Sequence, residues 1–279
     1  MLRKIARKIH SKLPIKIKSI IRYFLSDKYG KKYYWAGGNY IWIYPFLDKF
    51  LQSNKKLKHY SIVEIGSRDC LDAIEFAEKY NPQNIFVFEA SRSGIQRCCE
   101  ILKDNHYYSK NIIFHGIALG EKDEFAEFYE FSYEDPWALN KVNIGASSMG
   151  AWTSENLPEN HRHKNINNAS IKYKVPVLKG DNFLANNTNE ILLICIDVEG
   201  FELSVMKGLH KTLSNTIFVC VELSYNLNRK NVPADADIVH EFLLKNNFEP
   251  VFCDATKGNF FPKKTDFTQV FNCLYQRKN

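Results

Sequence analysis

Three acidic residues follow a fully apolar run in the C-terminal half of the chain. The run ILLICI, residues 191–196, leads directly into Asp197, Glu199 and Glu202, and the next apolar run, IFVCVEL, ends at Glu222. Open α/β sheets bind ligands at the carboxyl ends of their strands, so this pattern predicts an active-site edge. Asp197 is the first candidate for general base, with Glu199 and Glu222 behind it. The carboxylates could equally hold each other through water, and Glu202, which begins a helix, is expected to be structural.

A second constellation surrounds the glycine of EIGSRD, residues 64–69. It stands where an apolar strand is predicted to end and a helix, Leu71 to Tyr80, to begin. Glycine at such a turn lets the backbone approach a ligand, and the helix N-terminus presents free N–H groups. Glu89 closes the next apolar run, 23 positions after Gly66 (89 − 66). An acid at this spacing accepts hydrogen bonds from ribose hydroxyls in doubly wound sheets, although it could merely end a strand.

Short apolar runs alternate with helical stretches from Ser61 onward. Runs of this length, bounded by turn residues, predict an α/β fold with a doubly wound, mostly parallel sheet. The interval 121–180 breaks the rhythm and predicts a strand pair and a long loop, an insertion expected to line the acceptor pocket. The predicted strands are SIVEIG, NIFVFEA, NIIFHGIAL, ILLICIDVEG, IFVCVEL, FEPVFCD and QVFNCLY.

The basic residues are concentrated at the start of the chain. The whole sequence has 38 Lys and Arg against 31 Asp and Glu, a net charge of +7, but residues 1–25 hold eight of the basic residues and no acid. The rest has 30 basic and 31 acidic residues, which argues against a nucleic-acid partner. Apolar residues recur among the basic ones at helical spacing. Residues 1–59 are therefore predicted to be a basic amphipathic helical extension and lead-in, and residues 60–279 the main domain.

The pattern of residues 1–25 fits two different roles equally well. The extension either docks on an anionic membrane surface or packs on the main domain. The Gly/Tyr/Trp cluster of residues 30–42 is expected to cover the ligand cleft, and a helix is expected from Tyr44 to Asn54.

The seven cysteines lack CxxC pairing, and several lie in apolar runs. We expect them to be reduced. No apolar stretch has the length of a signal peptide or of a membrane span, about 20 residues. The predicted location is cytoplasmic, with peripheral association at the inner face of the membrane if residues 1–25 bind lipid. The sequence leaves the oligomeric state open.

The blocks EIGSRD, FEAS, IALGEKDE, GASSM and IDVEGFELSVMKGL resemble, in this order, those of the FkbM family of O-methyltransferases over about residues 60–275. The run IDVEG-x-E-x-x-V-x-x-G is the specific one, while the others are shared more widely among class I methyltransferases. The resemblance implies a class I methyltransferase Rossmann-like fold and S-adenosylmethionine as cofactor, with S-adenosylhomocysteine as product. Asp197 would lie nearest the transferring methyl group, and Glu89 would hold the ribose.

The resemblance also implies the other cofactor contacts. The methionine part is expected against Glu64, Gly66, Ser67, Arg68 and Asp69. The adenosine is expected against Ala90 and Ser91, with Ala118, Leu119 and Gly120 at the adenine edge. Ser147 and Ser148 of GASSM would contact the acceptor or the cofactor, unless they only form a turn, and Tyr225 is a further candidate acceptor contact.

Two residues depart from the family's pattern. Cys70 stands where a second glycine is common, which could tighten or tilt the cofactor loop. Cys195 stands where a lysine often precedes IDVEG, which removes a charge beside the acids. Neither change deletes a group that cofactor binding requires.

Several functions remain open at this point. Family analogy favours transfer to a hydroxyl of a small molecule or glycan, such as a sugar or surface-polysaccharide precursor. The alternatives are a nicotinamide-dependent sugar oxidoreductase, against which the missing second glycine of a dinucleotide loop argues, and a non-catalytic membrane-associated nucleotide-binding protein. A divalent metal bound by the acids is less favoured than metal-free transfer, and no metal ligand is assigned.

Overall fold

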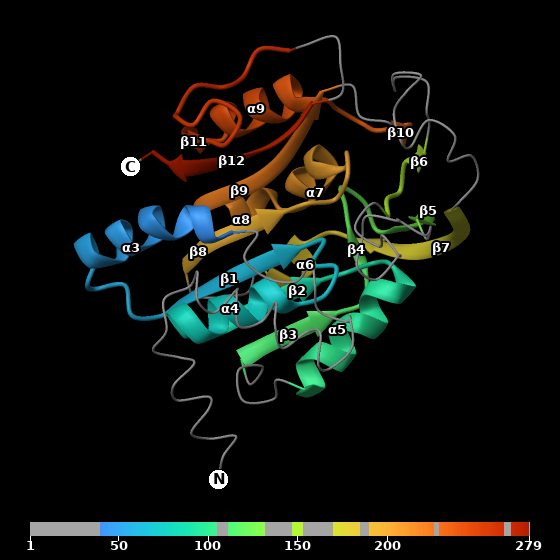
Figure 1. Cartoon of the computed structure of the whole chain (residues 1–279), viewed down its shortest axis with the longest axis horizontal. Coiled ribbons are helices and arrows are strands. Elements are labelled where there is room, and N and C mark those ends of the chain that lie inside the picture. Colours follow the sequence, from blue (N-terminus) through green and yellow to red (C-terminus); the bar gives the residue numbers. More distant parts are fainter. Residues whose placement is uncertain are drawn as a thin grey trace, which may run out of the picture.

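The structure is a computed structural model of the chain, and it describes residues 40–104, 111–131, 147–152, 170–184, 190–225, 229–264 and 269–278. A seven-stranded sheet with the order β11-β12-β9-β8-β1-β2-β3 crosses the molecule (Figure 1). The five strands from β9 to β3 pair in parallel, and β12 and β11 add an antiparallel edge. The strands are β1 (Tyr60–Ile65), β2 (Asn84–Phe88), β3 (Ile112–His115), β8 (Glu190–Ile196), β9 (Thr216–Tyr225), β11 (Phe248–Cys253) and β12 (Gln269–Arg277).

Helices cover both faces of this sheet. On one face, residues of η1 (Ile41–Ile43), α3 (Tyr44–Ser53), α4 (Leu71–Tyr80) and α5 (Arg92–Asp104) form a buried apolar cluster with the strands. On the other, a second cluster packs the strands against α6 (Asp181–Leu184), α7 (Glu202–Gly208), α8 (His210–Leu213) and α9 (Ala236–Lys245). Every residue of β1 is buried, as expected for a parallel strand covered on both faces. The predicted doubly wound α/β fold is confirmed.

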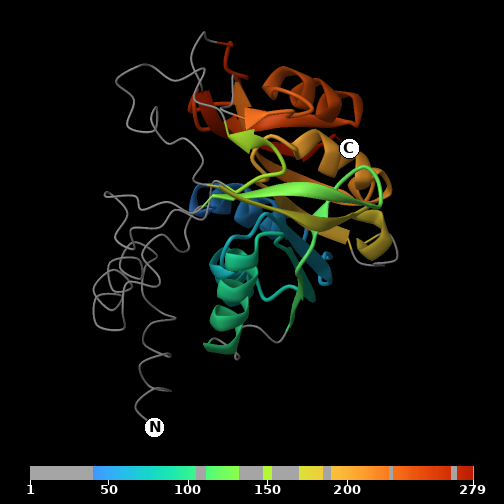
Figure 2. The same ribbon diagram turned by 90° about the vertical axis from the view of Figure 1, so that its right-hand side faces the viewer.

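A second, three-stranded sheet has the order β4-β7-β5. The strand pair predicted within 121–180 is present, since β5 (Glu124–Phe131) pairs antiparallel with β7 (Ser170–Leu178) over eight residues. Figure 2 shows these two strands running alongside each other. The predicted strand NIIFHGIAL is split, because β3 belongs to the large sheet, whereas β4 (Ala118–Leu119) pairs with β7. A short antiparallel pair, β6 (Ala151–Trp152) with β10 (Arg229–Lys230), completes the strands of the described residues.

The part of the predicted lead-in that the structure describes, from residue 40 onward, has the expected helix. The helix expected from Tyr44 to Asn54 is α3. The predicted basic extension of residues 1–25 lies outside the described residues, and the domain boundaries remain a prediction. Of the helices in the described residues, none is both long and apolar enough to span a membrane.

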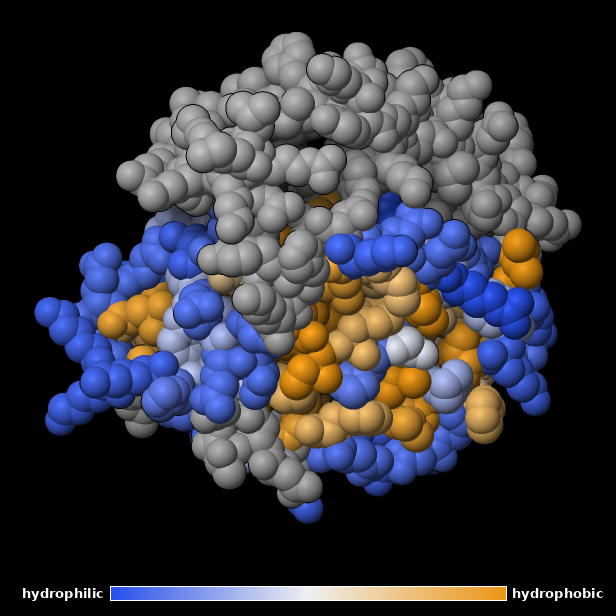
Figure 3. Space-filling model, turned by 90° about the horizontal axis from the view of Figure 1, so that it is seen from below, coloured by the Kyte–Doolittle hydropathy of each residue, from blue (hydrophilic) through white to orange (hydrophobic). Residues whose placement is uncertain are grey.

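The two edge strands of the large sheet are β11 and β3, and Ile113 of β3 is 39% exposed. Seen from below, hydrophobic side chains gather near the centre of this face among hydrophilic ones (Figure 3).

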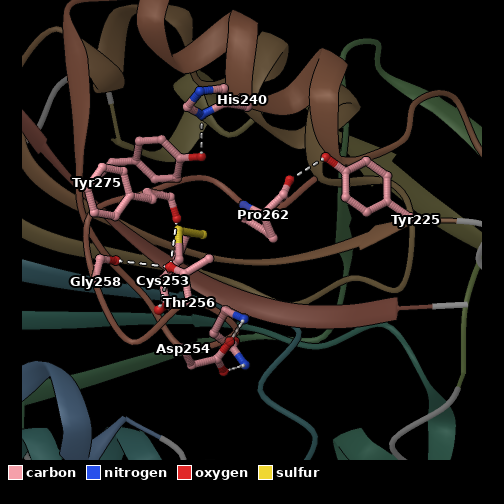
Figure 4. The surroundings of a disulfide bond; sticks show 11 residues. Tyr225, His240, Cys253, Asp254, Thr256, Gly258, Pro262 and Tyr275 are labelled. Carbon is pink, nitrogen blue, oxygen red and sulfur yellow. Dashed lines mark hydrogen bonds between the residues drawn. A yellow bond between two sulfur atoms is a disulfide. The ribbon is translucent and has the colours of Figure 1, made fainter. Parts of the chain in front are cut away.

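Two cysteines form a disulfide, which corrects the prediction that all seven are reduced. Cys253 of β11 and Cys273 of β12 are direct partners in the antiparallel register and are joined by a disulfide (Figure 4). They are 20 residues apart in sequence, so only the strand pairing reveals that they are neighbours. The free cysteines are Cys70, Cys98, Cys195 and Cys220, all buried, and the exposed Cys99.

Candidate active site

A pocket opens at the carboxyl edge of the large sheet, where β1, β2 and β8 end. Most of the predicted site residues line it, although they come from five separate stretches of sequence. They are Glu64, Gly66, Ser67, Arg68, Glu89, Ala90, Ala118, Leu119, Ser147, Ser148, Asp197 and Glu199. Asp69, Ser91, Gly120, Glu222 and Tyr225 are not in the lining.

The turn after β1 depends on Gly66 for a reason that the sequence did not reveal. Gly66 has φ +83° and its N–H donates to the carbonyl of Phe88 at 2.9 Å. A Cβ at this position would lie 1.7 Å from the backbone carbonyl oxygen of Asp197. The backbone at the end of β1 therefore lies directly against the backbone at the end of β8. This contact requires the glycine, rather than the close contact with a ligand that we expected.

Glu89 ties the end of β2 to this turn. Its Oε2 accepts a hydrogen bond from the backbone N–H of Arg68 at 2.8 Å. Its Oε1 accepts from the backbone N–H and the hydroxyl of Ser91, at 2.7 and 2.6 Å. Gly94 leaves room for this arrangement, because a Cβ there would lie 2.7 Å from the Glu89 carboxyl carbon. Glu89 thus lies in the pocket with a fixed orientation.

Asp69 and Ser91 support the pocket from behind. The Asp69 carboxylate, only 1% exposed, forms an ion pair with Arg68 at 3.2 Å and accepts from the backbone N–H of Leu71 at the start of α4. Ser91 is buried against Glu89. Both were predicted as cofactor contacts; they do not line the pocket, and their polar atoms hydrogen-bond Arg68 and Glu89, which do.

The two departures from the family's pattern have local consequences. Cys70 adopts the left-handed conformation, φ 60°, where a glycine would be unstrained, and its N–H donates to Ser67 Oγ at 3.0 Å. Cys195 lies directly across from Glu64 in the paired strands and hydrogen-bonds Cys220. With no cation at position 195, burial raises the pKa of Glu64 well above its ordinary value, and the charge of Asp72 adds to the effect.

Asp197, Glu199 and Glu222 form an acidic cluster, with one carboxylate oxygen of each within 4.8 Å of the others. The register of β8 and β9 brings Asp197 beside Glu222, because the residues before them, Ile196 and Val221, are partners. Burial raises the pKa of Asp197, and the charge of Arg68 and a hydrogen bond from Glu222 oppose that shift. Burial and the charge of Asp197 raise the pKa of Glu222 well above its usual range.

The chemistry of this cluster follows from its charges. Two hydrogen-bonded carboxyl groups must share one proton, so Asp197 is the better base and Glu222 the proton-bearing partner. Three carboxylate oxygens this close also form a set that could hold a hard divalent cation.

The loop after Asp197 is held by two side chains from other elements. Glu199 has φ 53°, and its carbonyl accepts a hydrogen bond from Ser148 Oγ at 3.0 Å. Glu202 Oε1 accepts from the backbone N–H of Gly200 at 3.0 Å. Burial raises the pKa of Glu202 from 4.5 to about 7. Glu202 has the expected structural role. Ser148 is 2% exposed, and its hydroxyl holds the loop through Glu199 rather than offering a contact to the acceptor.

Tyr225 and Gly120 do not reach the pocket, which corrects both predictions. Tyr225 is fully buried in the core, with its hydroxyl 2.5 Å from Asp237 Oδ1 and 3.1 Å from the carbonyl of Pro262 (Figure 4). β9 continues past the end of β8 while still paired with β12, and its alternation turns Tyr225 toward α9. Gly120 packs against the end of α7, where a Cβ on Gly208 would lie 1.9 Å from its carbonyl oxygen.

The sequence missed several residues of the pocket. Tyr40, 8% exposed, stacks on Phe76 with 5.8 Å between ring centroids, and burial raises its pKa. It belongs to the aromatic cluster that was expected to cover the cleft. Phe128 comes from β5 of the second sheet, and no motif signals it; Met149 ends the GASSM block, of which only the two serines were assigned to the site. The other missed lining residues are Ile65, Asp72, Phe88, Ile117 and Val198.

A comparison with protein families identifies a methyltransferase domain. The sequence matches the family described as the methyltransferase FkbM domain over residues 31–250. Similar solved structures include methyltransferase FkbM from Methylobacillus flagellatus KT, with 15% identity and a TM-score of 0.41 over 78% of this chain and 43% of that one. This chain thus covers less than half the length of the M. flagellatus protein.

Two further solved structures are similar over most of this chain. M. capricolum TrmK in complex with S-adenosylhomocysteine has 8% identity and a TM-score of 0.41, over 82% of this chain and 67% of that one. The N-terminal domain of EvdMO1, in the presence of S-adenosylhomocysteine and D-fucose, has 7% identity and a TM-score of 0.41, over 83% and 82%. No curated protein matches the sequence.

Proposed function

The chain belongs to the FkbM methyltransferase family, and we propose that it transfers a methyl group from S-adenosylmethionine to a hydroxyl of a sugar or surface-polysaccharide precursor. The observation that carries this proposal is that Glu89 and Asp197 line one pocket at the carboxyl edge of the sheet. A ribose acid and a candidate base on the same pocket are what nucleotide-dependent transfer to a hydroxyl requires.

The pocket offers groups that fit each part of this cofactor. Glu64 Oε2 is buried without a hydrogen-bond partner among the described residues, and the ammonium group of the cofactor's methionine part would supply the missing donor. The backbone of Gly66, Ser67 and Arg68 would border the same part. Glu89 would accept hydrogen bonds from the ribose hydroxyls.

The chain's own residues have two tasks in the reaction. S-adenosylmethionine supplies the electrophilic methyl group, and the protein must align the acceptor hydroxyl with it and remove the hydroxyl proton. Asp197 accepts that proton, while Glu222, which hydrogen-bonds it, fixes its orientation. The charge of Arg68 opposes the rise that burial causes in the pKa of Asp197.

A transfer assay tests this assignment. S-adenosylmethionine with a labelled methyl group is incubated with the protein and a panel of sugars, nucleotide sugars and lipid-linked glycans, with and without EDTA. We expect methylated product from at least one acceptor in both conditions, and loss of product for Asp197→Asn with S-adenosylhomocysteine binding retained. Unchanged turnover of Asp197→Asn would transfer the role of base to Glu222, and loss of product with EDTA would assign the acidic cluster to a metal.

We further propose that residues 1–25 hold the protein at an anionic membrane, which would place it near lipid-linked acceptors. The support is the eight basic residues and no acid within an amphipathic pattern. Flotation with vesicles of phosphatidylglycerol and phosphatidylcholine tests this. The full chain should float and a chain lacking residues 1–25 should not; equal flotation of both would remove the proposal.

A further inference from the structure

The pocket has both charged and apolar lining residues. The acidic Glu64, Glu89 and Asp197 belong to the lining, and so do the apolar Ala90, Ala118, Phe128 and Met149. Ala118 and Phe128 belong to a small buried apolar cluster of the second sheet, against which Ala90 and Met149 pack. These four residues therefore give the pocket an apolar wall.

The wall is fixed by strand alternation and by pairing. Phe128 is 6% exposed and points inward from β5, with Tyr173 of β7 behind it at 5.7 Å between ring centroids. Phe125, three positions earlier on the same strand, is 72% exposed on the opposite face. The backbone of Tyr129 exchanges two hydrogen bonds with Ser148, at 2.8 and 3.1 Å, which places the neighbouring Met149 beside Phe128.

The polar groups around the wall are directed elsewhere. The Glu130 carboxylate accepts hydrogen bonds from the Tyr173 hydroxyl at 2.5 Å and the Ser93 N–H at 3.0 Å. Ser148 Oγ bonds Glu199 and Gly150. A sugar or polysaccharide needs hydrogen-bond partners for its hydroxyls, and an aromatic ring with a thioether offers a flat apolar surface instead.

We propose that Phe128 of β5 and Met149, which follows the residue bridged to Tyr129, bind the purine ring of the cofactor. This inference rests on the proposed function and adds to it: the insertion, expected to line the acceptor pocket, contributes to cofactor binding through these two residues. The purine follows the ribose, and the ribose acid Glu89 adjoins Ala90 at the edge of the apolar wall. The ring would pack against the apolar wall formed by Ala90, Ala118, Phe128 and Met149.

Calorimetric titration with S-adenosylhomocysteine and with adenosine tests the inference. The variants are Phe128→Ala, Phe128→Leu and Met149→Ala, and Phe125→Ala is the matched control on the exposed face of the same strand. Loss of a stacking and apolar surface should weaken both ligands about tenfold in Phe128→Ala, and less in Phe128→Leu, which keeps the apolar volume. Phe125→Ala should bind as the wild type does.

The outcomes separate this inference from the proposed function. If the wild type binds S-adenosylhomocysteine and both folded Phe128→Leu and Met149→Ala bind it equally tightly, the purine lies elsewhere and the inference is wrong. If the wild type binds neither ligand, the proposed function fails as well. Melting temperatures establish that each variant is folded.

Discussion

Ser148 Oγ donates a hydrogen bond to the carbonyl oxygen of Glu199 at 3.0 Å and thereby ties the second sheet to the loop that carries the acids. The two residues are 51 positions apart in sequence. The same Oγ accepts from the N–H of Gly150, so both hydrogen-bonding functions of the hydroxyl are used. The tie holds Glu199 in its left-handed conformation and joins the cofactor side of the pocket to the acidic side.

Ser148→Ala should therefore lower the free energy of unfolding by about 1–3 kcal/mol, because it removes a buried group with two hydrogen bonds. Denaturant unfolding measures this loss. Ser214→Ala is the control, since the Ser214 hydroxyl makes one exposed hydrogen bond to Lys211, and its loss should stay within about 0.5 kcal/mol. Equal small losses in both variants would show that the tie contributes nothing.

Gly66→Ala should be far more destabilising. The added Cβ meets the carbonyl oxygen of Asp197, and the φ of +83° strains any other residue. Backbone strain and overpacking together predict a loss of about 3 kcal/mol or more. Gly258→Ala, whose Cβ has no neighbour nearer than 3.7 Å, should be close to neutral. A soluble, cooperatively melting Gly66→Ala protein of wild-type stability would contradict the packing of β1 against β8.

Glu202→Gln should change how stability depends on pH. The pKa of Glu202 is raised by burial from 4.5 to about 7, so the folded state binds a proton that the unfolded state releases between these values. Its contribution is complete below pH 4.5 and lost as the pH rises through about 7. Relative to Glu202→Gln, the wild type should lose about 3 kcal/mol over that window, measured by denaturant unfolding at a series of pH values. Parallel curves for the two proteins would refute the shifted pKa.

The disulfide between Cys253 and Cys273 should be detectable and stabilising. Alkylation of the unfolded, unreduced protein should label five of the seven cysteines, and all seven after reduction. Closing a loop of 20 residues restricts the unfolded chain, so the double variant Cys253→Ala and Cys273→Ala should lose about 3 kcal/mol of stability. Cys99→Ala, at an exposed free thiol, is the control. Seven labelled thiols without reduction would disprove the bond.

The sequence predicted those parts of the molecule that are determined by residues close together in the chain. Helix α4 spans Leu71–Tyr80, as its periodicity indicated, and Asp197 lies at the end of a buried strand, as its apolar run required. The predictions failed where the position of a residue depends on pairing between strands that are distant in sequence. Tyr225 is turned into the core because β9 continues beyond the end of β8 in its pairing with β12, and Phe128 reaches the pocket only because β5 pairs with β7. No local pattern distinguishes Phe128 from the exposed Phe125.

The central claim is that the pocket between Glu89 and Asp197 binds S-adenosylmethionine. Calorimetric titration of the full chain with S-adenosylhomocysteine, and separately with NAD and NADH, tests it most directly. We expect micromolar binding of S-adenosylhomocysteine alone, and loss of that binding in Glu89→Ala. Binding of a nicotinamide cofactor would contradict this expectation, and so would the absence of detectable binding of all three ligands to the folded protein.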